Sequence, residues 1–167
     1  MIDLFIIDYS IPACSKYKLN DGVDLINYIK EKYPNAKIVI LSSLSSPLLI
    51  FDIIKKTEPD GFWLKSDIDD RTLINYINLV CKDETIYSES VQKSFEHVSN
   101  YAKVLDENNR KILLLLDKGI KTKHLPNFIP LSLDTINHRK AKIKLSLGVN
   151  SKDDYELLKK AQHLGLL

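Results

Sequence analysis

Residues 131–149 read LSLDTINHRKAKIKLSLGV, and this stretch predicts an amphipathic helix with two defined ends. Ser132 can cap the amino terminus, and the negative charge of Asp134 in the first turn suits the positive end of the helix dipole. A glycine follows the last apolar residue, as it commonly does where a helix stops. At about 100° per residue, one side carries the apolar positions and is expected to face a core. These positions are Leu133, Ile136, Ile143 and Leu147.

The other side of this predicted helix is polar and basic. Asn137, His138, Ala141 and Lys142 point outward, while Arg139, Lys140 and Lys144 flank the apolar stripe. Phosphates attract cationic donors, and base edges are read by short polar or amide side chains. Because a short helix and a turn precede the stretch, the pattern is typical of a helix presented to a DNA groove. The residues expected to contact double-stranded DNA are Thr122, Lys123, Ser132, Thr135, Asn137, His138, Arg139, Lys140, Lys142 and Lys144.

Composition favours an intracellular protein without a membrane segment. The chain has 167 residues, of which 44% are hydrophobic, enough for two small domains with buried cores. No apolar run approaches the roughly 20 residues of a membrane span, and no signal peptide follows Met1. Cys14 and Cys81 suit a reducing compartment, and the four histidines have no ligand-like spacing. We therefore expect a cytoplasmic protein with no metal site.

Charge is distributed unevenly along the chain. Residues 1–104 contain 12 Lys and Arg against 15 Asp and Glu, whereas residues 105–167 contain 12 against 7. The amino-terminal part is therefore acidic and the carboxy-terminal part basic. This asymmetry indicates that a polyanionic partner would bind the carboxy-terminal part.

The amino-terminal half alternates between two kinds of segment. Residues 3–8, 37–42 and 61–65 are short, almost wholly apolar runs, which predict parallel strands buried on both faces. Amphipathic helices are expected between and after them, at 21–32, 46–57 and 67–82, with Ser46 as a cap and Pro47 in the first turn. This order predicts an α/β fold, a partial doubly wound parallel sheet.

The carboxy-terminal part predicts an all-α domain of four helices. They are expected at 106–118, from about 122, at 132–147 and at 151–164. In the polar segment before these helices, the alternation of apolar and polar positions is weaker. We therefore expect a first domain at 1–91, a linker at 92–104 and a helical domain at 105–167.

Polar side chains stand at the ends of three successive predicted strands. These are Asp8, Ser42 and Lys65, with Phe62 three residues before the lysine. In open α/β sheets, chemistry collects beyond the carboxyl ends of strands. A carboxylate can accept a phosphoryl group, a hydroxyl can bond to its oxygens, and an ammonium group can neutralise them. Each residue taken singly could equally be a turn former, a solvated lysine or part of a core.

Taken together, DLFIIDYSIP, KIVILS and DGFWLKS resemble the receiver domain of two-component response regulators. The resemblance, which is to a flavodoxin-like receiver, implies that Asp8 is the phosphoacceptor, Ser42 the switch hydroxyl and Lys65 the partner lysine. It places Phe62 at the position of the aromatic residue that moves on phosphorylation.

Residues 105–149 resemble a LuxR-type helix-turn-helix, as in NarL-like response regulators. The combined resemblance covers nearly all of the chain. It implies a DNA-binding transcriptional regulator that acts as a homodimer, with a sensor histidine kinase as a further partner.

The chain departs from the family pattern in two places. It begins at the family's third strand, so the acidic pair that holds Mg²⁺ is absent, and phosphorylation is expected to be impaired. No cofactor is expected unless acidic Mg²⁺ ligands come from outside this chain. The strand at 3–8 would become an uncovered edge, as in a fragment or in half of a dimer. Asn108 and Asn109 replace the family's usual Arg-Glu pair in the first helix of the helix-turn-helix.

Two other functions remain open. A degenerate receiver could serve as a protein-interaction or dimerisation module, which an unpaired edge strand favours. A phosphotransfer enzyme with Asp8 as nucleophile would need a second aspartate two residues later, where Ser10 stands. We therefore do not expect an enzyme.

Overall fold

The computed structural model describes residues 3–17 and 19–167, which form two compact units. The sheet unit comprises Met1–Leu44 and Ile53–Lys93, and the helical unit comprises Ser45–Asp52 and Ser94–Leu167. The boundary after Lys93 lies close to the one expected at 91/92. The sequence did not indicate that Ser45–Asp52 belongs with the carboxy-terminal residues.

The sheet unit is built on parallel strands in the order β1-β2-β3-β4. They are β1 (Leu4–Ile7), β2 (Lys37–Ser42), β3 (Gly61–Leu64) and β4 (Ile86–Tyr87). The first three confirm the predicted runs. The two-residue β4 is too short and too polar in its surroundings to give a pattern, so it was not predicted. Within the described residues β1 lies at the edge of the sheet.

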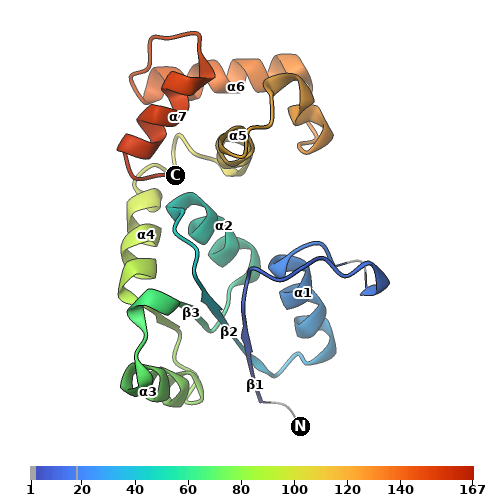
Figure 1. The fold of residues 1–167 in the computed structure, drawn as a ribbon, viewed down its shortest axis with the longest axis vertical. Helices are drawn as coiled ribbons and strands as arrows, with labels where there is room; N and C mark the ends of the chain where they lie inside the picture. Colours follow the sequence, from blue (N-terminus) through green and yellow to red (C-terminus); the bar gives the residue numbers. More distant parts are fainter. Residues whose placement is uncertain (1–2, 18) are drawn as a thin grey trace. The chain divides into compact units, whose positions relative to one another are not determined.

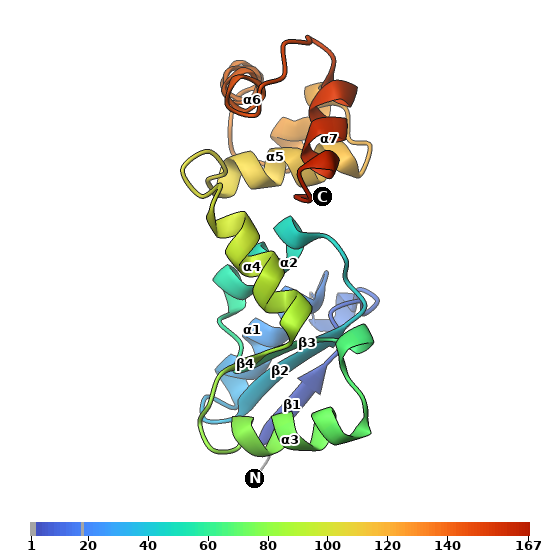
Figure 2. The ribbon, with the colours of Figure 1, turned by 90° about the vertical axis from the view of Figure 1, so that its left-hand side faces the viewer.

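Helices cover both faces of this sheet, as the predicted α/β fold requires (Figures 1 and 2). Helix α3 (Asp70–Val80) packs on the face that carries Val39 and Trp63. Helix α1 (Gly22–Lys32) lies on the opposite side, next to the end of α2 (Pro47–Thr57). The Lys30 Nζ donates to the Thr57 carbonyl oxygen at 2.5 Å, which ties these two helices together.

Aspartate and serine side chains define where several helices begin. Asp21, where the predicted helix begins, accepts hydrogen bonds from Val23 N and Asp24 N at the start of α1. Ser46 accepts a long bond of 3.4 Å from Leu49 N at the start of α2. Asp69 rather than Asp67 caps α3, because Lys65–Asp67 forms a separate 3₁₀ turn, η2. The helix predicted at 67–82 is therefore shorter at both ends.

The expected linker at 92–104 is largely helical. Helix α4 (Glu89–Ser99) occupies most of it, and its first turn is capped by Asp67, which accepts from Ser90 N at 3.0 Å. The polar composition that suggested a linker reflects the exposed face of this helix.

The helical unit contains the four predicted carboxy-terminal helices. They are α5 (Glu107–Asp117), the 3₁₀ helix η3 (Thr122–Asn127), α6 (Leu133–Ser146) and α7 (Asp154–His163). Gly119 follows α5 with φ of +80°, a conformation that residues with a side chain rarely adopt. Ile112, Leu125 and Ile143 lie fully buried in one shared core. Leu133, which was predicted to join this core, is 39% exposed, so that prediction is wrong. It is the first residue of α6.

The first half of α2 also belongs to the core of the helical unit. Leu48 and Phe51 are buried in its apolar cluster. Asp52 accepts a hydrogen bond from Arg110 Nε of α5 at 2.5 Å, and both side chains are at most 10% exposed. The Arg110 guanidinium also stacks over the Phe51 ring at 4.9 Å and donates to the Leu105 carbonyl oxygen. A buried charge of this kind needs all of these partners.

Among the residues that the structure describes, no helix is long and apolar enough to cross a membrane.

Replacing Asp52 with alanine should leave the Arg110 charge buried without its counter-ion and lower the free energy of unfolding by about 3 kcal/mol or more. Urea denaturation followed by circular dichroism measures this loss. Lys93→Ala is a matched control, because its ion pair with Glu89 is exposed and should leave the unfolding midpoint nearly unchanged. Equal midpoints for the two variants would contradict a stabilising role for the buried pair.

Candidate functional site

The amino terminus of α6 is organised by two hydroxyl side chains. Ser132 accepts from Thr135 N at 3.2 Å and so caps the helix, as predicted, and its Oγ lies 2.9 Å from Thr135 Oγ1. Both residues are exposed. The helix therefore begins with a fixed end, with its first turn directed to solvent.

The outward face of α6 matches the sequence prediction. Asn137, His138, Ala141 and Lys142 are all exposed. Lys123 of η3, the element that precedes the turn, is exposed as well. This surface offers an amide, an imidazole and two ammonium groups. The N–H groups of these side chains can donate hydrogen bonds to the acceptor atoms of bases and phosphates.

Lys140 and Lys144, in contrast, are directed into the helical unit. Each is 8% exposed. The Lys140 Nζ donates to Asp154 Oδ2 at 2.5 Å and to Thr122 Oγ1 at 2.6 Å, and the Lys144 Nζ lies 3.1 Å from Asp154 Oδ1. Thr122 Oγ1 itself donates to the same carboxylate at 2.9 Å. One carboxylate on α7 thus joins η3, α6 and α7.

The ionised form of Asp154 is the one that this arrangement favours. Burial by itself would raise its pKa, but hydrogen bonds from Lys140, Thr122 and Lys144 outweigh burial and hold the pKa below the usual value for an aspartate. The carboxylate therefore remains charged at neutral pH and balances the two lysines.

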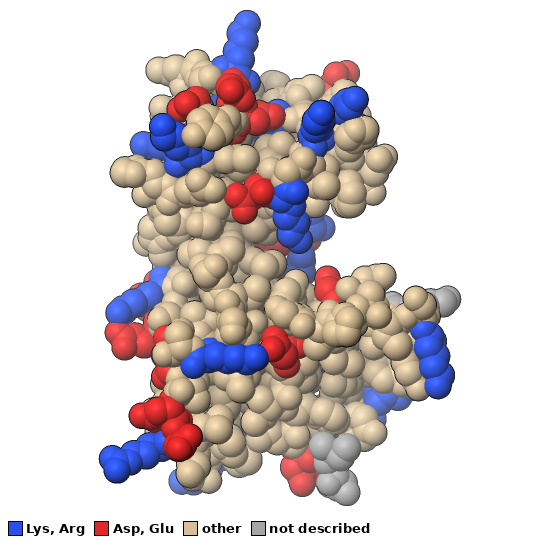
Figure 3. Space-filling model, in the orientation of Figure 1, with Lys and Arg blue, Asp and Glu red and all other residues tan. Residues whose placement is uncertain are grey.

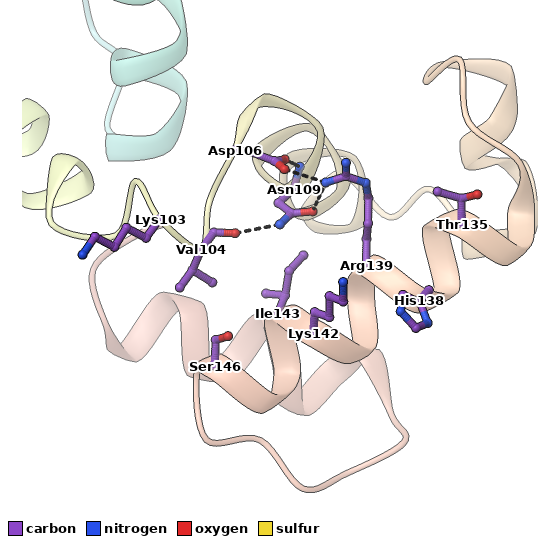
Figure 4. A pocket seen from close by; sticks show the side chains of 10 residues that line it. All are labelled: Lys103, Val104, Asp106, Asn109, Thr135, His138, Arg139, Lys142, Ile143 and Ser146. Carbon is purple, nitrogen blue, oxygen red and sulfur yellow. Dashed lines mark hydrogen bonds and ion pairs between the residues drawn. The ribbon is translucent and has the colours of Figure 1, made fainter.

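Arg139 is held on the other flank of α6. Its Nη1 donates to Asp106 Oδ2 at 2.6 Å and to Asn109 Oδ1 at 3.0 Å (Figure 4). Asp106 also caps α5 by accepting from Asn109 N. Burial would raise the pKa of Asp106, but the bonds from Arg139 and Asn109 lower it. Asp106 and Asn109 together therefore hold Arg139 against the start of α5.

A pocket of about 460 Å³ lies between the start of α5 and α6 (Figure 4). His138, Arg139 and Lys142 line it from α6, and Asp106 and Asn109 line it from α5. Its charge is mixed, because the carboxylate of Asp106 offsets the guanidinium of Arg139. On the face of the molecule drawn in Figure 3, basic and acidic side chains are likewise interspersed rather than gathered by sign.

The ten residues predicted to contact DNA thus fall into two groups. Thr122, Arg139, Lys140 and Lys144 bond to other parts of the helical unit, and Ser132 and Thr135 organise the helix start. The second group, Lys123, Asn137, His138 and Lys142, is exposed. DNA contact by any of the ten residues stays a prediction.

Two of the three polar residues predicted at the strand ends meet in the sheet unit. The Lys65 Nζ donates to Asp8 Oδ2 at 2.7 Å. This bond from Lys65, with a second from Ser10 N, lowers the pKa of Asp8. The carboxylate is 38% exposed and so is accessible to a small molecule.

The other two predicted residues are buried. Phe62 and Ser42 have no exposed surface, so Phe62 is part of the core of the sheet unit. Ser42 Oγ finds no hydrogen-bond partner among the described residues. A buried hydroxyl without a partner is unusual in folded proteins.

Around Asp8, the described residues do not supply the group of carboxylates that a magnesium site needs. Throughout residues 3–17 and 19–167, no three His, Cys, Asp or Glu side chains come together in a group that could hold a metal ion. The residues present therefore do not fit the Mg²⁺ site of a receiver, which needs several carboxylate or carbonyl oxygens.

Comparison with known proteins relates both units to one family. No protein-family model matches the chain. The oxygen regulatory protein NreC of Staphylococcus aureus is 27% identical over 95% of this chain and 76% of its own length. A chain in a structure of two RcsB dimers bound to two parallel DNAs is also similar, with 26% sequence identity and a TM-score of 0.59. The match covers 96% of this chain and 74% of the RcsB chain. RcsB from Salmonella enterica serovar Typhimurium bound to a promoter is similar with 25% sequence identity and a TM-score of 0.57. That match covers 94% of this chain and 73% of the RcsB chain.

The chain is homologous to NarL-like response regulators. This confirms the resemblance drawn from the strand ends and from residues 105–149. It also confirms the fold class, an α/β sheet unit followed by a helix-turn-helix, since the match extends over both parts.

Sequence reasoning missed two residues that organise the helix-turn-helix. They are Asp106 and Asp154, the partners of the inward-facing cations. A signal was present, because Lys140 and Lys144 are one turn apart and lie beside the apolar stripe. Lysines in that position need a buried counter-ion, and an acidic residue at the start of the next helix was the natural candidate.

The substitution Asp154→Asn should destabilise the helical unit at neutral pH by about 2 to 4 kcal/mol, because two nearly buried lysines would lose their counter-ion. Thermal or urea unfolding measures this change. Asp134→Asn, at an exposed position in the first turn of α6, is the matched control and should change the midpoint much less.

The carboxylate of Asp154 should also make the free energy of unfolding depend on pH in the acidic range. Because the pKa of Asp154 is lowered on folding, its stabilising effect is present above the pKa of an unfolded aspartate, about 4, and is lost as the pH falls through the folded value. Wild type should therefore lose stability between about pH 5 and pH 3 more steeply than Asp154→Asn. Parallel pH profiles for the two proteins would rule out this assignment.

Proposed function

We propose that this protein is a DNA-binding transcriptional regulator of the two-component response-regulator type, which binds duplex DNA as a homodimer through α6. The observation that carries the proposal is the outward face of α6, a capped helix that follows a short helix and a turn and exposes Asn137, His138 and Lys142. Homologous RcsB dimers bound to DNA support it.

Within this proposal the basic residues have two different roles, contact with DNA and positioning of α6. Lys142 on α6 and Lys123 on η3 contact phosphates, since their ammonium groups lie at the surface. Asn137 and His138 face the base edges. Arg139, Lys140 and Lys144 act through the protein, because their bonds to Asp106 and Asp154 set the orientation of α6.

We further propose that Asp8 is the phosphoacceptor position and that its phosphorylation is impaired. Lys65 is in place to neutralise one phosphoryl oxygen. The described residues do not form the magnesium site that the transfer needs. Mg²⁺ would act only with ligands from outside this chain, and a sensor histidine kinase is the expected phosphoryl donor. The matched relatives are regulators rather than enzymes, which argues against Asp8 as an enzymatic nucleophile.

A second candidate function, protein interaction through the sheet unit, is favoured by one observation. Ile6 on the edge strand is 42% exposed and Ile74 on α3 is 63% exposed. Apolar side chains at a sheet edge are common features of interfaces between chains. Dimerisation through these residues is compatible with DNA binding through α6.

Replacing Lys142 with alanine should lower the affinity for duplex DNA severalfold and reduce the slope of log affinity against log salt by about one. Fluorescence anisotropy at several salt concentrations gives both values. Lys118→Ala, at an exposed lysine just after α5, should change neither. A wild-type affinity that does not fall with salt would refute DNA binding of this kind.

The impairment at Asp8 can be tested by incubating wild type and Asp8→Ala with acetyl phosphate and Mg²⁺ and measuring intact mass. We expect neither protein to gain a phosphoryl group, because Lys65 is the only charged partner of the carboxylate that the described residues provide. Addition of one phosphoryl group to wild type alone would confirm Asp8 as the acceptor and show that it is functional.

A further inference from the structure

The centre of the outward face of α6 is apolar. At about 100° per residue, Ala141 and Leu145 point between Asn137 on one side and His138 and Lys142 on the other. Ala141 is exposed, and Leu145 is 79% exposed, the largest value among the exposed large hydrophobic residues of the helical unit. One exposed leucine is ordinary on a protein surface, but here it adjoins the exposed Ala141, and together they form an apolar strip in the middle of an otherwise polar helix face.

The neighbouring lysines do not reach over this apolar centre. Lys140 and Lys144 precede Ala141 and Leu145 by one residue each, but their ammonium groups are bonded to Asp154 inside the helical unit. Arg139 is bonded to Asp106 on the far flank. The ion pairs therefore leave Ala141 and Leu145 uncovered in the middle of the surface proposed to enter the DNA.

A hollow along the same face has room for the edge of a base. It measures about 400 Å³ and is lined by residues 149–152 of the following loop and by five residues of α6, namely Asn137, Lys140, Ala141, Lys144 and Leu145. Lys140 and Lys144 contribute to the wall, but their ammonium groups are paired with Asp154, so the amide of Asn137 and the apolar side chains of Ala141 and Leu145 are the groups left for a base.

We infer that α6 reads thymine through Ala141 and Leu145 and adenine through Asn137, so that the regulator selects A·T base pairs in the centre of each half-site. The inference rests on the proposed function. The C5-methyl of thymine is the apolar group that base pairs present in the major groove, and an asparagine amide pairs with the N6 and N7 atoms of adenine.

The spacing of these side chains fits neighbouring base pairs. Residues four apart on a helix are separated by about 6 Å along its axis, and base pairs two steps apart by about 7 Å. Asn137, Ala141 and Leu145 follow one another at this interval. The thymine contacted by Ala141 should therefore lie within about two base pairs of the adenine read by Asn137.

The test begins with selection of the preferred duplex from a random DNA library by the full chain. Each thymine of that duplex is then replaced in turn by uracil, which removes only the C5-methyl group, and the dissociation constant is measured at fixed salt. We expect about three- to fivefold weaker binding at one or two positions, the factor that burial of one methyl group provides.

The protein variants assign those positions. In Ala141→Gly, the difference in affinity between thymine and uracil should vanish at the position that Ala141 contacts and persist at the position that Leu145 contacts. In Leu145→Ala, the difference should become smaller only at the position that Leu145 contacts. Because the measured quantity is the ratio of two affinities for the same protein, a loss of helix stability in either variant cancels. Asn137→Ala should relax the preference for adenine nearby by about tenfold.

The outcomes separate the inference from the function on which it rests. A chain that enriches no sequence and binds duplexes no better than heparin overturns both. A chain that enriches a sequence but tolerates uracil at every thymine, or keeps its thymine preference in Ala141→Gly and Leu145→Ala, overturns the inference and leaves DNA binding in place.

Discussion

The carboxylate of Asp154 is the group on which the arrangement of the helix-turn-helix depends. It accepts hydrogen bonds from Lys140 and Thr122 and forms an ion pair with Lys144, and these residues come from the two elements that form the motif. Burying two ammonium groups is costly, and the cost is offset only when the counter-ion is held at short range. Rotation of α6 about its axis would break these bonds, so a single ion-pair network specifies which side of the helix is outward.

This constraint has a consequence for recognition. A helix with four basic residues in six positions would normally offer a strongly positive and unselective surface. Here three of the four are neutralised by Asp154 and Asp106, and Lys142 is the one at the surface. Affinity from phosphates is thereby limited, and the exposed surface is a mixture of amide, imidazole and apolar groups. Such a surface favours discrimination between bases over unspecific attraction.

The sheet unit has the opposite character, since parts of a receiver site are present but do not form a complete one. Asp8 and Lys65 follow the carboxyl ends of β1 and β3 and form a direct ion pair. Ser42 is buried without a partner for its hydroxyl in the described structure. A lysine can neutralise one oxygen of a phosphoryl group, but in-line transfer also needs the divalent cation that bridges the other oxygens. The proposal that phosphorylation of Asp8 is impaired follows from this geometry, and it leaves dimerisation or a partner as the proposed control of the output.

Local sequence patterns determined most of the secondary structure of this protein. Three β-rich runs, the serine and aspartate caps and the glycine after α5 act over a few residues, so the strands, the helix order and the outward position of Asn137, His138 and Lys142 could be predicted. Tertiary structure alone decided which charges are available to a ligand, because Arg139 and Lys140 pair with carboxylates 33 and 14 residues away. It also decided that Ser45–Asp52 joins the helical unit through the buried pair of Asp52 and Arg110. The physical reason is the same in each case: a cap is satisfied by its own backbone, whereas a buried ion finds its partner only when distant segments pack together.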